Sequence, residues 1–239
     1  MTNVLILGSG PEVVQARDWS RDGIDVIVAI NHAWQVRADW DVQIHPWDFP
    51  ADRLPPADTP ARIVTEAEFV PAQNAHGGFV YAGATMAFTA GYWALNEYKP
   101  RCIAYFGCNM IYPSKGRTHF YGRGHPDPLR RDITLQSLEA KSARLRILAA
   151  QRGTAVVNLS HEDSRLMLPR AQIGALPGAP APYDTTAATL ARRREAVLDY
   201  YVPSGRYWEE IERFDPAQLA RLDALWLRAG ALGKAAVAA

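Results

Sequence analysis

The sequence predicts an α/β fold, a parallel sheet with helices on both faces. Short runs of β-branched and other apolar residues alternate with longer segments of helical periodicity from the first residues onward. Strands and helices in alternation are typical of a parallel sheet covered by its crossover helices. The 239 residues, 48% of them hydrophobic, suffice to bury the core of one large domain, which excludes disorder as the main state.

The expected strands and helices follow one another in chain order. Six short apolar runs predict buried strands, at residues 4–7, 25–30, 42–45, 62–65, 102–106 and 155–159. Helical patterns lie between them at 12–21, 84–97 and 132–152. The last pattern ends at Arg152-Gly153, a basic final turn followed by a residue that stops helices.

Proline and glycine divide the chain into three parts. Residues 1–168 are expected to form the sheet domain, and residues 169–183, with four prolines and two glycines, predict an irregular linker. Residues 184–239 predict a helical C-terminal appendage with helices at 184–201, 206–214 and 216–229. Asp215-Pro216 is a favourable start for the last helix, because Asp caps helices and Pro suits the first helical position.

Charge and cysteine content exclude several classes of protein. Lys and Arg total 26 against 25 for Asp and Glu, so no overall field attracts nucleic acid, and no nucleic-acid partner is expected. Two cysteines cannot build a disulfide framework and fit a reducing compartment. Neither a signal peptide nor an apolar run of roughly 20 residues is apparent, so we expect a soluble cytoplasmic protein.

The last predicted helix carries an apolar stripe of Leu219, Leu222, Leu225 and Trp226. We expect this stripe to pack on the body of the protein or on a twin subunit, which would make a homo-oligomer. The alternative is a peripheral contact with the inner face of the membrane.

The first candidate site is the turn Leu7-Gly8-Ser9-Gly10-Pro11, directly after the first strand. Two glycines allow close backbone approach, and the following helix start offers free N–H groups to a phosphate. A dinucleotide fingerprint would need glycine at Val13 and an acidic residue at Asn31, so an NAD-type site is not expected. A mononucleotide phosphate or ribose remains, with Asn31 bonding base or sugar; the alternative is a tight turn without ligand.

The second candidate site is the long polar loop after the fifth strand, residues 107–128. It is rich in glycine, and Lys115, Arg117, Arg123, Arg130 and Arg131 face only Asp127 between residues 115 and 131. Such a surplus at a strand's carboxyl end suits a multiply charged anion, and the glycines would let the loop order over it as a lid. His119, His125, Tyr112 and Tyr121 add titratable bases and hydroxyl donors. A solvated basic loop is the alternative.

Metal and nucleophile chemistry have weaker support. His119 and His125 are six residues apart without nearby cysteine, so no metal site is predicted. Cys108 follows a strand and fits a small buried residue better than a nucleophile.

Several short motifs follow one another over roughly residues 3–165. They are Gly8-Ser9-Gly10-Pro11, Ile30-Asn31, His45-Pro46, Gly83-Ala84-Thr85, Phe106-Gly107-Cys108-Asn109-Met110-Ile111-Tyr112 and His119-Phe120-Tyr121-Gly122. In this order they resemble the bacterial lipooligosaccharide sialyltransferases of glycosyltransferase family 42. A related Rossmann-like group, the hydroxymethylpterin pyrophosphokinase-like and flagellin-glycosylation proteins, shares that core.

This resemblance implies a Rossmann-like nucleotide-binding domain and a set of site residues. Ser9, Asn31 and the turn at Gly83, Ala84 and Thr85 would contact the cytidine monophosphate part of a donor, with Gly8, Gly10 and Asn109 beside it. His45 stands where the sialyltransferases have an asparagine. Tyr112 and Tyr121 would hold the leaving phosphate. An ungapped match places Arg123 on the family's catalytic histidine, so His119 and His125 are joint candidates for the base and Arg123 is a candidate phosphate ligand.

The leading hypothesis is a glycosyltransferase that moves an acidic sugar from a CMP-activated donor to an acceptor hydroxyl by direct displacement. No cofactor is obligatory for that reaction, whose partners are a nucleotide sugar and a glycan or other hydroxyl acceptor. The alternatives are a pyrophosphokinase-like enzyme, which would use Mg²⁺, and a non-catalytic nucleotide-binding accessory protein. Transfer of pyrophosphate favours carboxylates, yet Asn109 stands after strand five, and Asp48 and Asp127 would have to serve.

Overall fold

Six parallel strands form the centre of the computed structural model, which describes residues 2–124 and 127–235. The strands are β1 (Asn3–Leu7), β2 (Val26–Ile30), β3 (Val42–Ile44), β4 (Arg62–Val64), β5 (Cys102–Phe106) and β6 (Ala155–Asn158). Their order across the sheet is β4-β3-β2-β1-β5-β6, and every neighbouring pair is parallel. The predicted α/β fold is therefore confirmed.

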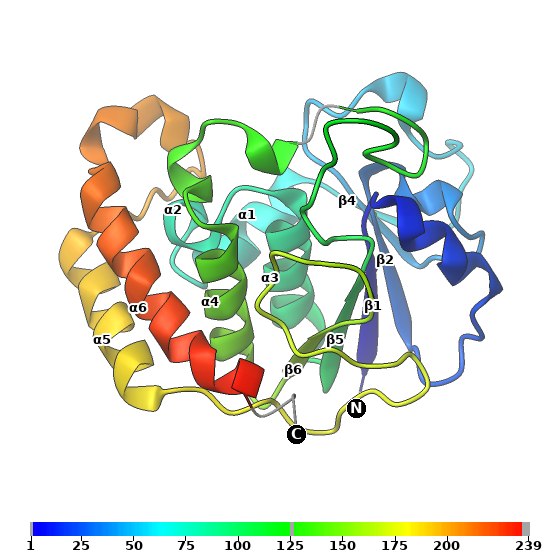
Figure 1. Cartoon of the computed structure of the whole chain (residues 1–239). Coiled ribbons are helices and arrows are strands. Elements are labelled where there is room, and N and C mark those ends of the chain that lie inside the picture. Colours follow the sequence, from blue (N-terminus) through cyan, green and yellow to red (C-terminus); the bar gives the residue numbers. More distant parts are fainter. Residues whose placement is uncertain (1, 125–126, 236–239) are drawn as a thin grey trace.

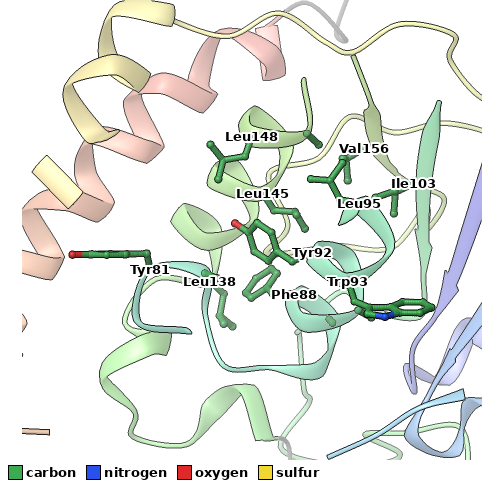
Figure 2. Packing of buried hydrophobic residues seen from close by; sticks show 14 of the residues in the cluster. Tyr81, Phe88, Tyr92, Trp93, Leu95, Ile103, Leu138, Leu145, Leu148 and Val156 are labelled. Carbon is green, nitrogen blue, oxygen red and sulfur yellow. The ribbon is translucent and has the colours of Figure 1, made fainter. Parts of the chain in front are cut away.

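Four α-helices of the described chain cover one face of the sheet (Figure 1). They are α1 (Glu66–Asn74), the short α2 (Phe79–Ala82), α3 (Met86–Tyr98) and α4 (Leu138–Ala150). Figure 2 shows Phe88 and Tyr92 of α3 packed beside Leu145 of α4, with Ile103 and Val156 of the sheet to their upper right. The helix predicted at 132–152 is divided, because Asp132 caps a 3₁₀ helix (Ile133–Leu135) and Ser137 then caps α4.

Shorter elements cover the opposite face of the sheet. Alternate strand residues such as Leu5 and Ile27 pack there against two 3₁₀ helices, Pro11–Asp18 and Asn31–Gln35, and against the segment at residues 171–176. The prediction of an α-helix at 12–21 thus gives the right position but the wrong helix type. Helices do lie on both faces, and part of the predicted linker completes the second cover.

The C-terminal segment forms an outer layer on the helical side of the molecule (Figure 1). Helices α5 (Thr185–Leu198) and α6 (Pro216–Ala235) pack on each other, and α6 packs on α4; a 3₁₀ helix (Tyr207–Arg213) connects them. Asp215 caps α6 through its side chain, as predicted. Leu219, Leu222 and Trp226 are buried in the same core as α3, so the apolar stripe packs on the body of the protein.

Buried charges fix this outer layer to α4. Arg144 is completely buried and donates to both carboxylate oxygens of Glu195, at 2.7 and 3.0 Å, and to the Tyr92 hydroxyl at 2.8 Å. Burial alone would raise the pKa of Glu195, yet the charge of Arg144 and its hydrogen bonds hold that pKa below its usual value. Lys141 of α4 pairs with Asp223 of α6 at 3.0 Å. Within the described part of the chain, no helix is long and apolar enough to cross a membrane.

Candidate functional site

A large cleft lies at the carboxyl edge of the sheet, beyond the ends of the neighbouring strands β1 and β5. The strand order reverses at this point, because the chain continues from β1 to β2, β3 and β4 on one side and later returns to β5 on the other. In open α/β sheets such a switch point is the usual place of ligand binding. The cleft measures about 2100 Å³, and segments 8–12, 30–31, 84–87, 107–113 and 117–121 contribute to its walls.

The glycine turn after β1 crosses the loop after β5 at close range. Gly8 N–H donates to the carbonyl of Phe106 at 2.8 Å, and Gly10 N–H donates to the carbonyl of Gly107 at 2.7 Å. A Cβ atom on Gly8 would lie only 2.4 Å from Cys108 Sγ. Glycine is therefore required here for the contact between two loops, a role that the motif alone does not distinguish from ligand contact.

A carboxylate occupies the helix start that was expected to receive phosphate. Glu12 accepts a hydrogen bond from Asn109 Nδ2 at 2.8 Å and another from its own backbone N–H. Burial, and to a smaller extent the neighbouring Glu162, raises the pKa of Glu12. Asn109 is itself held by Ser160 and Asn158, at 2.7 and 2.9 Å. The turn thus suits hydroxyl or amino groups that donate hydrogen bonds, and not a phosphate.

Two residues of the cleft have strained backbones. Asn31 and Met110 have φ angles of +51° and +58°, in the left-handed region that favours glycine. The two other non-glycine residues in this region among those described, Lys99 and Asp199, end α-helices. Strain of this kind clusters at binding sites, which supports the cleft as the functional region. The buried Asn31 Oδ1 also has no hydrogen-bond partner within the described chain.

Residues 118–122 of the basic loop form a tight hairpin docked on the glycine turn, at the upper edge of Figure 1. His119 and Gly122 form an antiparallel bridge, and Phe120 N–H donates to the carbonyl of Ser9 at 2.9 Å. The Tyr121 ring lies between two imidazoles, with its centroid 5.0 Å from that of His119 and 4.5 Å from that of His32. Closure of this loop over a ligand stays a prediction.

His119 has the environment of a base. Its side chain is buried against Tyr112 and Tyr121, and its Nδ1 lies 2.9 Å from Thr118 Oγ1. Burial lowers its pKa, so the neutral imidazole dominates at neutral pH.

His32 is also buried, and the sequence did not single it out as a site residue. Its position directly after Asn31, at the end of β2, was the signal that could have found it.

Most of the predicted site residues share the cleft. Those that line it are Gly8, Ser9, Gly10, Asn31, Ala84, Thr85, Asn109, Tyr112, His119 and Tyr121. Three others do not line it. His45 turns its Nδ1 to the Pro46 carbonyl at 2.8 Å, and Gly83 ends α2 against Phe88. Arg123 donates to the Ser114 carbonyl at 2.7 Å and so ties the loop to itself.

Two further predictions concern residues at or beyond the cleft. His125 lies outside the described residues. Cys108 is buried, and burial raises the pKa of its thiol, which agrees with a packing role.

Across residues 2–124 and 127–235, no group of three or more His, Cys, Asp or Glu side chains is arranged to hold a metal ion. Comparison of the chain with protein-family models, with curated proteins and with solved structures finds no match.

Proposed function

We propose that the protein is a glycosyltransferase that moves an acidic sugar from a CMP-activated donor to an acceptor hydroxyl by direct displacement. The observation that carries the proposal is the position of His119, a buried and neutral imidazole in the same cleft as the loops after β1 and β5. Displacement at an anomeric carbon needs a base for the acceptor and stabilisation of the leaving phosphate.

The polarity of the cleft supports one orientation of the donor. Hydroxyl groups of ribose, or the amino group of cytosine, would donate to Glu12 and to the unpartnered oxygen of Asn31. The phosphate would then lie away from Glu12, toward Tyr112 and Arg117, which line the cleft on the loop side. Tyrosine hydroxyl and guanidinium groups both donate to phosphate oxygens.

The reaction then follows from this orientation. His119 Nε2 takes the proton of the acceptor hydroxyl while the acceptor oxygen bonds to the anomeric carbon. The bond from that carbon to the CMP oxygen breaks, and its electron pair leaves with the phosphate. The reaction requires the tautomer with its proton on Nδ1, which would donate to Thr118 Oγ1 at 2.9 Å and leave the lone pair on Nε2.

One observation favours a second candidate, a pyrophosphokinase-like enzyme. Glu12, Glu162 and Asp163 line the cleft, so carboxylates do occur near the place where Mg²⁺ and phosphates would lie. Magnesium-dependent release of AMP from ATP would be its signature.

The experiment has two stages. First, thermal shift with CMP, UMP, GMP, ATP and their sugar conjugates tests for preference for cytidine nucleotides, since a specific ligand stabilises the protein by mass action. Second, turnover of the preferred conjugate is measured for His119→Ala. The control is His161→Ala, which removes an exposed imidazole that also lines the cleft.

We expect His119→Ala to keep its affinity for CMP within a few-fold and to lose roughly 10²–10⁴ in turnover. His161→Ala should keep both. Absence of any preference for cytidine nucleotides would refute the proposal, and full turnover in His119→Ala would refute the assigned base.

A further inference from the structure

The cleft extends well beyond the space that a nucleotide sugar needs. Sites for small molecules usually measure about 300–1,000 Å³, whereas this cleft measures about 2100 Å³. Its wall away from the glycine turn consists of residues 66–71 of α1, Phe79 of α2 and residues 204–209 of the C-terminal layer. The outer layer is therefore part of the cleft.

This wall is held in place by specific contacts. The hydroxyl of Tyr207 donates to Asp132 Oδ2 at 2.6 Å, and its ring stacks on Phe79 with centroids 6.4 Å apart. Gly205 has a φ of +76°, and a Cβ atom there would lie 3.0 Å from Val70 Cγ1. A surface fixed in this way is preformed, so ligand binding to it does not carry the entropic cost of ordering these residues.

Two tryptophans are exposed in the same cleft. The side chains of Trp47, after β3, and Trp208, in the C-terminal layer, are 73% and 54% exposed. Five charged side chains of the lining belong to the wall, contact it or adjoin Trp47 in sequence: three carboxylates and two guanidinium groups, those of Asp48, Glu66, Glu209, Arg130 and Arg206. Glu12, Arg117, Glu162 and Asp163 belong to other parts of the lining. Indoles left open at a concave surface are typical of binding sites, and near balance of charge suits a neutral ligand.

We propose that this wall, together with Trp47 and Asp48 of the same cleft, is a binding subsite for a neutral saccharide chain, the acceptor of the reaction. A pyranose ring has an apolar C–H face that packs on an indole and hydroxyl edges that bond to carboxylate and guanidinium groups. An alkyl chain would match the indoles but would take the charged groups out of water without offering them a hydrogen bond. The identification of the ligand as the acceptor rests on the proposed glycosyltransferase function, whereas binding of the saccharide itself does not.

The test measures saccharide binding without nucleotide. Maltotetraose, cellotetraose, chitotetraose and lacto-N-neotetraose at millimolar concentration are titrated by saturation-transfer NMR and calorimetry. We expect one or more to bind, and Trp47→Ala and Trp208→Ala each to weaken that binding by about tenfold or more. Trp208→Phe should restore most of it, because it restores an aromatic face. Val197→Ala removes an equally exposed apolar side chain from α5, outside the cleft, and should change nothing.

A titration of CMP on the same variants separates the two proposals. CMP affinity should be unchanged in both alanine variants, which also shows that they are folded. CMP binding without binding of any of the four saccharides, or unaltered saccharide binding in both variants, would overturn the subsite. Saccharide binding without any CMP binding would support the subsite and refute the glycosyltransferase.

Discussion

The buried ion pair between Arg144 of α4 and Glu195 of α5 permits a quantitative prediction of a loss in unfolding free energy. Arg144→Met keeps a long apolar side chain in the same space but removes two hydrogen bonds to Glu195, one to the Tyr92 hydroxyl and one to the His76 carbonyl. Breaking a buried pair by deleting one partner typically costs about 3–5 kcal/mol, because the other charge stays buried. Glu195 keeps Arg192 at 2.6 Å and the indole N–H of Trp226 at 2.9 Å, so we expect the lower half of that range.

Chemical denaturation of the wild type and the variant measures this loss of unfolding free energy. Arg165→Met is the matched control, since its partner Glu139 is 2.7 Å away but both side chains are about one-third exposed. Exposed pairs contribute about 0–1 kcal/mol. Equal losses in the two variants would refute the view that burial of the pair decides its effect.

The pH dependence of the same measurement provides a second check. The pKa of Glu195 is depressed in the folded protein, so its contribution is present above its unfolded pKa and is lost as pH falls through the folded value. Arg144→Met removes the main source of that depression. The stability difference between wild type and variant should therefore shrink on acidification from neutral pH, and a constant difference would contradict the assignment.

Three further predictions concern the cleft. Gly107 has a φ of +72°, and a Cβ atom there would lie 2.7 Å from Val13, so Gly107→Ala should lower the unfolding free energy by about 1–3 kcal/mol and weaken CMP binding. The control is Gly23→Ala, at a φ of +77° but in open space, which should lower the unfolding free energy less and leave CMP affinity unchanged. Glu12→Gln should weaken CMP binding by about 1.5–3 kcal/mol in calorimetry, the typical contribution of a hydrogen bond to a charged group. Unchanged binding would refute a contact between Glu12 and CMP. The pH profile of kcat/KM should rise through a pKa below the usual 6.5 of histidine and stay flat at neutral pH, since His119 acts when neutral; a profile still rising above pH 7 would point to another base.

The strands were predictable because buried parallel strands are short apolar runs, and β1, β2 and β5 occupy nearly the ranges expected. The position of the cleft followed from the same pattern through the rule for parallel sheets. The carboxylate of Glu12 at the helix start was not predictable, because its orientation depends on Asn109, 97 residues away.

The burial of the charged side chains of α4 was also not predictable from the helix sequence alone. Arg144 and Lys141 look like solvent-facing residues until their partners, 51 and 82 residues further along the chain, are known. Arg123 was a candidate phosphate ligand from its position in the resemblance, and the structure shows its guanidinium donating to the Gly116 and Ser114 carbonyls of its own loop, contacts that its charge and sequence position do not reveal.

The buried cations of α4 also bear on the order in which the protein can mature during synthesis. Lys141, Arg144 and Arg146 emerge from the ribosome well before Glu195, Asp223 and the Gly230 carbonyl that neutralise or bond to them. Until those residues arrive, α4 cannot be enclosed without stranding positive charge in a medium of low polarity. We therefore expect the nascent chain to keep this side of α4 in water until the segment from Glu195 to Gly230 has been synthesised.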